Sequence, residues 1–180
     1  MLILPKLTLV TGGAASGKSD YAERLIASSG LPKKYFATSQ IWDDEMAEKV
    51  RAHRTSRAGD GWDTVETGTD LVAAIHATVP DEAVLIDCAT MWLTAIMMAD
   101  GDPADEVPRV LGALSQSPTP FVIVTNEVGQ GIVPDTSMGR AFRNIQGRFN
   151  QAAARQADSV IAVMSGLPFA LKGTLPEVPQ

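Results

Sequence analysis

The chain has 180 residues, a length that fits one domain with a central sheet buried on both faces. Its 21 acidic residues outnumber 15 basic ones, and the net charge of −6 opposes long-range attraction to nucleic acid or an anionic membrane. There is no signal-peptide pattern, no apolar stretch long enough to span a bilayer, and only one cysteine, Cys88, which excludes an internal disulfide. We therefore expect a single domain over residues 1–180 in a cytoplasmic protein, with Cys88 as a small buried hydrophobic residue.

Runs with strand character alternate with helical patterns along the chain. Most of the strand runs are continuously apolar, which indicates burial on both faces and a mainly parallel central sheet with helices on each side. The sequence thus predicts an α/β fold, in which ligands gather at the carboxyl edge of the sheet. The expected strands are 7–11, 34–38, 83–87, 120–126 and 159–164, and the expected helices are 18–28, 43–57, 69–77, 90–98, 104–115 and 137–157.

A glycine-rich segment follows the first expected strand. It reads Gly12-Gly13-Ala14-Ala15-Ser16-Gly17-Lys18-Ser19 and meets the pattern G-x-x-x-x-G-K-[ST] between a strand and a helix. Such a loop turns backbone N–H groups toward phosphates, its lysine reaches the outer phosphates, and its serine hydroxyl binds Mg²⁺. The sequence therefore predicts a nucleoside triphosphate site, the alternative being an ordinary glycine-rich turn.

Polar residues follow several of the other expected strands, and in a doubly wound sheet they converge on the phosphate loop. Asp87 has the position of the carboxylate that completes a Mg²⁺ site, although it could instead cap the next helix. Glu127 is compatible with a general base, a Mg²⁺ partner or an acceptor that anchors its loop. The strand-end segments are Thr38-Ser39-Gln40, Asp87 and Thr125-Asn126-Glu127.

His53 lies in a cluster of basic residues. Lys49, His53 and Arg57 are four residues apart and share one face of an expected helix. Nearby cations lower the pKa of an imidazole, which keeps it neutral and nucleophilic, and the same cations could hold phosphates. The alternative is a solvated basic helix face.

The segment 126–134 leaves the strand 120–126 and contains two glycines and a proline, which is typical of a shaped loop. Gly129 and Gly131 are expected to permit positive φ or the close approach of a ligand. On the following helix, Arg140, Asn144 and Arg148 form a stripe that faces either phosphates or water.

Together these segments resemble the bifunctional adenosylcobinamide kinase and adenosylcobinamide-phosphate guanylyltransferase family of cobalamin biosynthesis. The likeness extends from about Leu7 to Gly166, and the last of its four motifs is far more specific than the phosphate loop. The motifs are Thr11-Gly-Gly-Ala-x-Ser-Gly-Lys-Ser, Tyr35-x-Ala-Thr-Ser-Gln-Ile-x-Asp-Asp-Glu-Met-Ala, His53-x-x-x-Arg57 and Val124-Thr-Asn-Glu-Val-Gly-x-Gly-Ile-Val-Pro.

The resemblance implies a P-loop NTPase of RecA-like fold that uses ATP and GTP as substrates, Mg²⁺ as cofactor and a corrinoid as acceptor. It implies a homo-oligomer, commonly a trimer. First the γ-phosphoryl group passes to the aminopropanol hydroxyl of adenosylcobinamide; then a histidine, matched by His53, takes GMP from GTP and transfers it to the new phosphate. Catalysis is assigned to His53 and Lys18 and metal binding to Ser19 and Asp87. The implied nucleotide contacts are Gly12 through Ser19, Thr38, Ser39, Gln40, Arg54, Thr55, Ser56, Arg57, Glu66 and Asp87.

Two other functional hypotheses remain open at this point. The chain could be a single-step small-molecule kinase in which His53 is structural. It could also be a nucleotide-gated binding module, in which hydrolysis changes a partner contact and no small molecule is phosphorylated.

Overall fold

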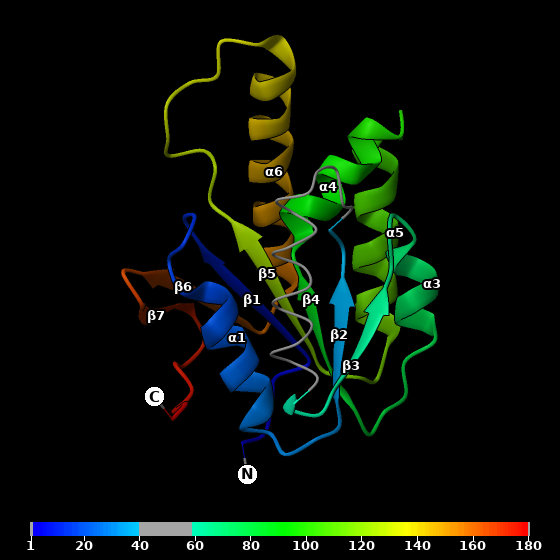
Figure 1. The fold of residues 1–180 in the computed structure, drawn as a ribbon, viewed down its shortest axis with the longest axis vertical. Helices are drawn as coiled ribbons and strands as arrows, with labels where there is room; N and C mark the ends of the chain where they lie inside the picture. Colours follow the sequence, from blue (N-terminus) through cyan, green and yellow to red (C-terminus); the bar gives the residue numbers. More distant parts are fainter. Residues whose placement is uncertain (1, 40–58, 180) are drawn as a thin grey trace.

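A computed structural model describes residues 2–39 and 59–179 (Figure 1). All strands in the described part belong to one seven-stranded sheet in the order β3-β2-β4-β5-β1-β6-β7. Neighbouring strands are parallel, except that β7 runs antiparallel to β6. The strands are β1 (Leu7–Gly12), β2 (Lys33–Ala37), β3 (Trp62–Glu66), β4 (Ala83–Asp87), β5 (Phe121–Asn126), β6 (Ser159–Met164) and β7 (Leu167–Lys172).

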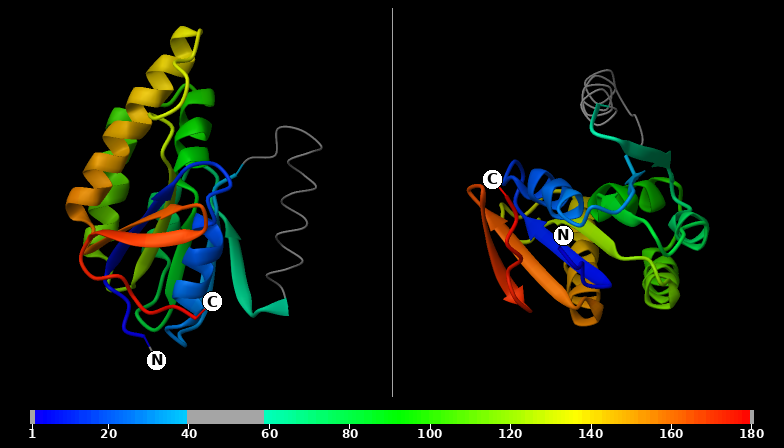
Figure 2. Two further views of the ribbon diagram at one scale, coloured as in Figure 1. Left: turned by 90° about the vertical axis from the view of Figure 1, so that its left-hand side faces the viewer. Right: turned by 90° about the horizontal axis from the view of Figure 1, so that it is seen from below.

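Helices cover both faces of the sheet, as the apolar strands predict (Figure 2). One face packs against α1, whose Tyr21, Leu25 and Ile26 share a buried cluster with the strand residues Val10 and Leu85. The described helices on the other face are α3, α4, α5 and α6. The helices are α1 (Lys18–Ala27), α3 (Leu71–His76), α4 (Ala89–Met98), α5 (Pro103–Gln116) and α6 (Ser137–Gln156).

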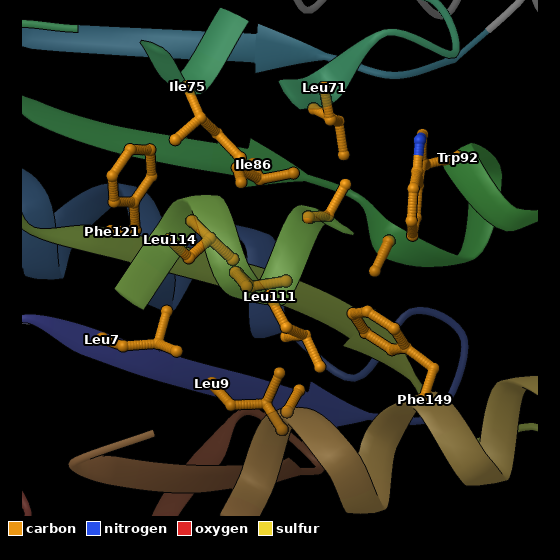
Figure 3. Close-up of a cluster of buried hydrophobic side chains, with 14 of the residues drawn as sticks. Leu7, Leu9, Leu71, Ile75, Ile86, Trp92, Leu111, Leu114, Phe121 and Phe149 are labelled. Atoms are coloured by element: carbon orange, nitrogen blue, oxygen red, sulfur yellow. The ribbon is translucent and has the colours of Figure 1, made fainter. Parts of the chain in front are cut away.

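The larger core lies between the sheet and α3 to α6 (Figure 3). Leu7 and Leu9 of β1 point into this core, while Val10 points to the opposite face, because successive side chains of a strand alternate. Trp92 of α4 and Phe149 of α6 meet edge to face, with ring centroids 6.1 Å apart. These contacts hold α4 and α6 beside the carboxyl end of β5.

Two strands were not expected from the sequence. β3 has three polar residues among its five and lies at one edge of the sheet, and β7 lies at the other edge and contains Pro168. The five expected strands and five of the six expected helices are confirmed to within two residues at each end, and the helix expected at 43–57 lies outside the described residues. No helix in the described ranges is long and apolar enough to cross a membrane.

Candidate nucleotide site

The phosphate loop, residues 12–19, connects the carboxyl end of β1 to the first turn of α1. Gly17 is the N-cap residue of α1, with φ of 89°, and no side chain caps the helix. Backbone N–H groups of the first turn are therefore left for a ligand. Lys18 is only 8% exposed, and its Nζ donates to the Gly13 carbonyl at 3.0 Å. The ammonium group thus folds back over the loop, as phosphate binding requires.

Two glycines of the loop have steric reasons to be glycine. A Cβ atom built on Gly12 would lie 2.5 Å from both the Ser16 Oγ and the Val163 carbonyl oxygen. Gly17 has positive φ, and its Cβ would lie 3.3 Å from the Gly166 Cα. The Gly166 N–H also donates to the Ser16 carbonyl at 2.9 Å. The turn between β6 and β7 therefore packs directly against the phosphate loop.

The strand register brings two of the predicted carboxylates to the same edge of the sheet. Asp87, at the end of β4, is level with Ala37 of β2, and Glu66, at the end of β3, pairs with the same residue. Because neighbouring strands lie about 4.8 Å apart, the backbones of Asp87 and Glu66 are separated by roughly 10 Å. β5 lies between β4 and β1, so the end of β5 lies beside the phosphate loop and the end of β4 lies one strand further along the same edge.

Lys18 and Asp87 both influence the thiol of Cys88. Burial, with the negative charge of Asp87 as a second cause, raises the pKa of Cys88 to about 11, while the charge of Lys18 opposes the shift. A buried, protonated thiol is a poor nucleophile, which agrees with the structural role expected for Cys88.

The remaining predicted contacts differ in what their side chains can offer. Thr38 is fully buried, and its hydroxyl donates to the Cys88 carbonyl and accepts from the Cys88 N–H, both at 2.8 Å. This hydroxyl therefore ties the end of β2 to the end of β4. Ser39, the next residue, is half-buried. Glu66 is exposed. The other predicted site residues, Gln40, His53, Arg54, Thr55, Ser56 and Arg57, lie outside the described residues.

The loop that follows β5 begins beside the phosphate loop. The Glu127 N–H donates to the Gly12 carbonyl at 2.9 Å, so the first residues of the two loops are tied together. Neither Gly129 nor Gly131 has positive φ, so that part of the expectation is wrong. A Cβ atom built on Gly131 would meet no atom within 4 Å, which leaves this position open to close approach.

A buried polar network, which the sequence did not reveal, positions the end of β5. Gln146 of α6 is fully buried and donates through Nε2 to Thr125 Oγ1 at 2.8 Å and to Asn150 Oδ1 at 2.9 Å. Asn150 donates in turn to the Asn126 carbonyl at 3.1 Å, and the Asn126 N–H donates to Thr90 Oγ1 at 2.9 Å. The spacing of Gln146 with the buried Phe149 and Ala153 was the available signal, since it places a polar residue on the buried face of α6.

The stripe on α6, formed by Arg140, Asn144 and Arg148, was expected to face either phosphates or water. The structure gives part of it another role. Arg140 donates to the carbonyls of Pro134 at 3.1 Å and Asp135 at 2.8 Å. Arg143, which the stripe did not include, donates to the carbonyl of Gly129. These two arginines hold the beginning and the end of the loop against α6, while Arg148 is exposed.

Ser19 and Asp87 fit a magnesium ion by the chemistry of their donors. Hydroxyl and carboxylate oxygens are hard ligands, and Mg²⁺ commonly takes one or two protein groups together with substrate phosphates and waters. Within the described ranges, no group of three or more His, Cys, Asp or Glu side chains could hold a metal ion by itself. A magnesium ion at this edge would therefore depend on the nucleotide for further ligands.

Comparison with known proteins matches residues 8–171 to the family described as cobinamide kinase / cobinamide phosphate guanyltransferase. The chain is 42% identical to the bifunctional adenosylcobalamin biosynthesis protein CobU of Escherichia coli K12, over 92% of this chain and 99% of that protein. It is 38% identical to the bifunctional adenosylcobalamin biosynthesis protein CobP of Pseudomonas aeruginosa, over 92% of this chain and 96% of that protein.

Solved structures show the same fold at low sequence identity. The RadB recombinase superposes with a TM-score of 0.53 at 17% identity, covering 88% of this chain and 74% of that one. A protein of Pyrococcus horikoshii OT3 superposes with a TM-score of 0.56 at 10% identity, covering 98% of this chain and 91% of that one. The RecA-like, mainly parallel architecture expected from the sequence is thus confirmed. On the extent and identity of the sequence matches, the chain belongs to the cobinamide kinase / cobinamide phosphate guanyltransferase family.

Proposed function

We propose that this chain carries out both reactions of its family on adenosylcobinamide. It phosphorylates the aminopropanol hydroxyl with a nucleoside triphosphate, and it then transfers GMP from GTP to the new phosphate to give adenosylcobinamide-GDP. The observation that carries the first step is the phosphate loop, in which a buried Lys18 folds back to Gly13 at 3.0 Å above the uncapped start of α1. That geometry supports phosphoryl transfer, which depends mainly on positioning and charge stabilisation.

For the second step we propose His53 as the nucleophile. Its imidazole attacks the α-phosphorus of GTP, the bond to the bridging oxygen breaks, and pyrophosphate leaves. The phosphate of the corrinoid then displaces the histidine and takes the guanylyl group. The basic neighbours Arg54 and Arg57 in the sequence support this role, because cations stabilise the departing pyrophosphate.

The assignment of individual contacts is likewise proposed. Backbone groups of Gly12 through Ser19 bind the phosphates, Lys18 neutralises charge on the transferred group, and Ser19 with Asp87 holds Mg²⁺, which would screen the charge of the triphosphate. Nucleotide contacts at Ser39, Glu66 and the segment 53–57 rest on their match to the family motifs. For Thr38, the engaged hydroxyl leaves the backbone as the group available to a ligand.

Three broader features belong to the same proposal. Residues 1–180 act as one nucleotide-binding domain, since every strand in the described ranges belongs to one sheet. A cytoplasmic location fits the free thiol of Cys88 and the nucleotide substrates. The chain forms a homo-oligomer, as its family resemblance implies.

The substitution His53→Ala separates the two steps. The variant is expected to retain phosphorylation of adenosylcobinamide and to lose both protein guanylylation and formation of adenosylcobinamide-GDP. Product analysis with γ-labelled ATP and α-labelled GTP measures both reactions. Loss of both activities in a folded variant would show that the roles are wrongly divided. His76→Ala is the matched control, because it changes the other histidine, an exposed residue of α3.

A further inference from the structure

A cavity beside the phosphate loop has no assigned occupant. Its volume is about 550 Å³, and three segments distant in sequence form its walls. The first half of the phosphate loop forms one wall, the loop after β5 forms the second, and the β6–β7 hairpin forms the third. The residues that matter here are Gly12, Gly13 and Ala14, then Glu127, and finally Met164, Phe169 and Leu171.

The hairpin wall is apolar. Met164 of β6 is 64% exposed, and Phe169 and Leu171 of the edge strand β7 are 43% and 61% exposed. The antiparallel pairing sets Phe169 opposite Ala162 and places both on one face of the hairpin. This wall suits the apolar body of a small molecule.

Glu127 supplies the carboxylate of the cavity. Its backbone is tied to Gly12 through the 2.9 Å hydrogen bond, which fixes the residue beside the phosphate loop. In the described part of the chain, no ion pair or hydrogen bond engages its side chain. The carboxylate is therefore held near the loop and remains free to accept a proton.

The position along the phosphate loop indicates which ligand enters. The cavity is lined by the first residues of the loop, and the Lys18 ammonium reaches back to Gly13, one of them. Because that lysine marks the outer phosphates, the cavity opens at the γ-phosphate end of a bound triphosphate. A phosphoryl acceptor must approach the γ-phosphorus from this end, in line with the bond that breaks.

We propose that the cavity binds the acceptor alcohol of the kinase step, with Glu127 as the catalytic base and the hairpin as the apolar wall. This inference rests on the proposed function. Glu127 takes the proton of the hydroxyl as its oxygen bonds to the γ-phosphorus. The bond to the β–γ bridging oxygen breaks, the nucleoside diphosphate leaves with that electron pair, and the proton passes to solvent.

The substitution Glu127→Gln distinguishes this role from the two alternatives. Gln keeps an acceptor oxygen, so a residue that only anchors the loop would tolerate it. A catalytic base would not tolerate this substitution. The kcat for adenosylcobinamide phosphorylation is therefore expected to fall by about 100-fold or more. The KM for nucleotide should stay within about twofold. Rescue by excess Mg²⁺ would instead indicate a metal ligand and would overturn the assignment.

Asp135→Asn is the control, since it changes an exposed carboxylate of the same loop that does not line the cavity. Self-guanylylation with GTP is measured in parallel. If the Glu127→Gln variant phosphorylates adenosylcobinamide at the wild-type rate, this inference is overturned and the proposed function stays intact. A wild-type protein that phosphorylates no adenosylcobinamide overturns both.

Phe169→Ala tests the apolar wall. The KM for adenosylcobinamide is expected to rise by roughly tenfold or more, with the KM for nucleotide unchanged. Leu167→Ala is the matched control, because Leu167 is 70% exposed on the same strand but does not line the cavity. A rise in the KM for nucleotide instead would mean that the cavity holds the nucleobase, and it would contradict the proposal.

Discussion

The phosphate loop and the loop after β5 leave adjacent strands at the same level of the sheet, but they are built differently. β1 and β5 pair directly, with Gly12 opposite Asn126. The phosphate-loop motif lies within eight consecutive residues, and the β6–β7 turn packs against it. The loop after β5 is fixed by α6, through Gln146, Arg140 and Arg143. One half of the site is thus encoded by a local sequence motif, and the position of the other half depends on contacts with a helix distant in sequence.

The difference has a consequence for variants. Substitutions in the phosphate loop are expected to act on phosphate binding directly. Substitutions that affect the second loop can lie on α6, many residues away along the chain, and they should act through stability and positioning.

The largest expected effect is that of Lys18→Ala on the locally encoded half. Loss of the ammonium group removes charge stabilisation of the transferred phosphoryl group, and kcat for phosphorylation should fall by about 100-fold or more. Initial rates with γ-labelled ATP measure this. Lys6→Ala is the control, because Lys6 is an exposed lysine that donates to the Ser115 carbonyl at 2.6 Å, away from the site. Equal rates for the Lys18 variant and the wild type would remove the phosphate loop from the mechanism.

The next largest effect is expected for Gly12→Ala, and it is an effect on the stability of the protein. Its Cβ would lie 2.5 Å from the Val163 carbonyl oxygen, a backbone atom, so the sheet edge must shift. We expect a loss of about 1–3 kcal/mol in the free energy of unfolding, by denaturant titration. Gly13→Ala is a matched control in the adjacent position, where a Cβ would meet nothing within 4 Å, and should cost less than about 0.5 kcal/mol. Equal losses in the two variants would contradict the packing described here.

Gln146→Ala tests the half that depends on tertiary contacts. The substitution removes the two hydrogen bonds to Thr125 and Asn150, and we expect a loss of about 1–2 kcal/mol. Asn144→Ala, an exposed change on the same helix, should have almost no effect. If Gln146→Ala leaves both stability and the KM for adenosylcobinamide unchanged, α6 does not position the end of β5.

The smallest expected effect concerns the pH dependence of stability. Burial raises the pKa of Cys88 from 9.0 to about 11, so the folded protein retains the thiol proton where the unfolded chain has lost it. Stability from this group is therefore full below pH 9 and is lost as the pH rises toward 11. At pH 10 the loss is about 1 kcal/mol. Thermal or denaturant unfolding of Cys88→Ala and wild type at pH 8 and pH 10 should reveal the difference, and identical pH dependences would contradict it.

The sequence predicted the elements whose information is local. The apolar runs of β1, β4 and β5 identified buried parallel strands, and the G-x-x-x-x-G-K-S segment identified the phosphate loop. β3 and β7 were missed because edge strands need no continuous apolar run. Three of the five residues in Trp62–Glu66 are polar, and Leu167–Lys172 contains a proline.

The site could be predicted only in part for the same reason. Asp87 follows an apolar strand and could be placed at the sheet edge, but the engagement of the Thr38 hydroxyl by Cys88 depends on the pairing of β2 with β4. Glu127 could be named but not assigned a role, because the cavity that it lines is completed by the β6–β7 hairpin, which lies about 40 residues further along the chain. Glu66 was found through the family resemblance alone.

The fate of both labels of GTP tests the two-step account most directly. Wild-type protein is incubated with adenosylcobinamide, Mg²⁺ and GTP labelled at either the α- or the γ-phosphate. We predict that the γ-label appears in the corrinoid, and that the α-label appears first on His53, in an acid-labile and base-stable bond, and later in the corrinoid. A γ-label in the corrinoid with no α-label on protein or corrinoid would contradict the account and indicate a single-step kinase.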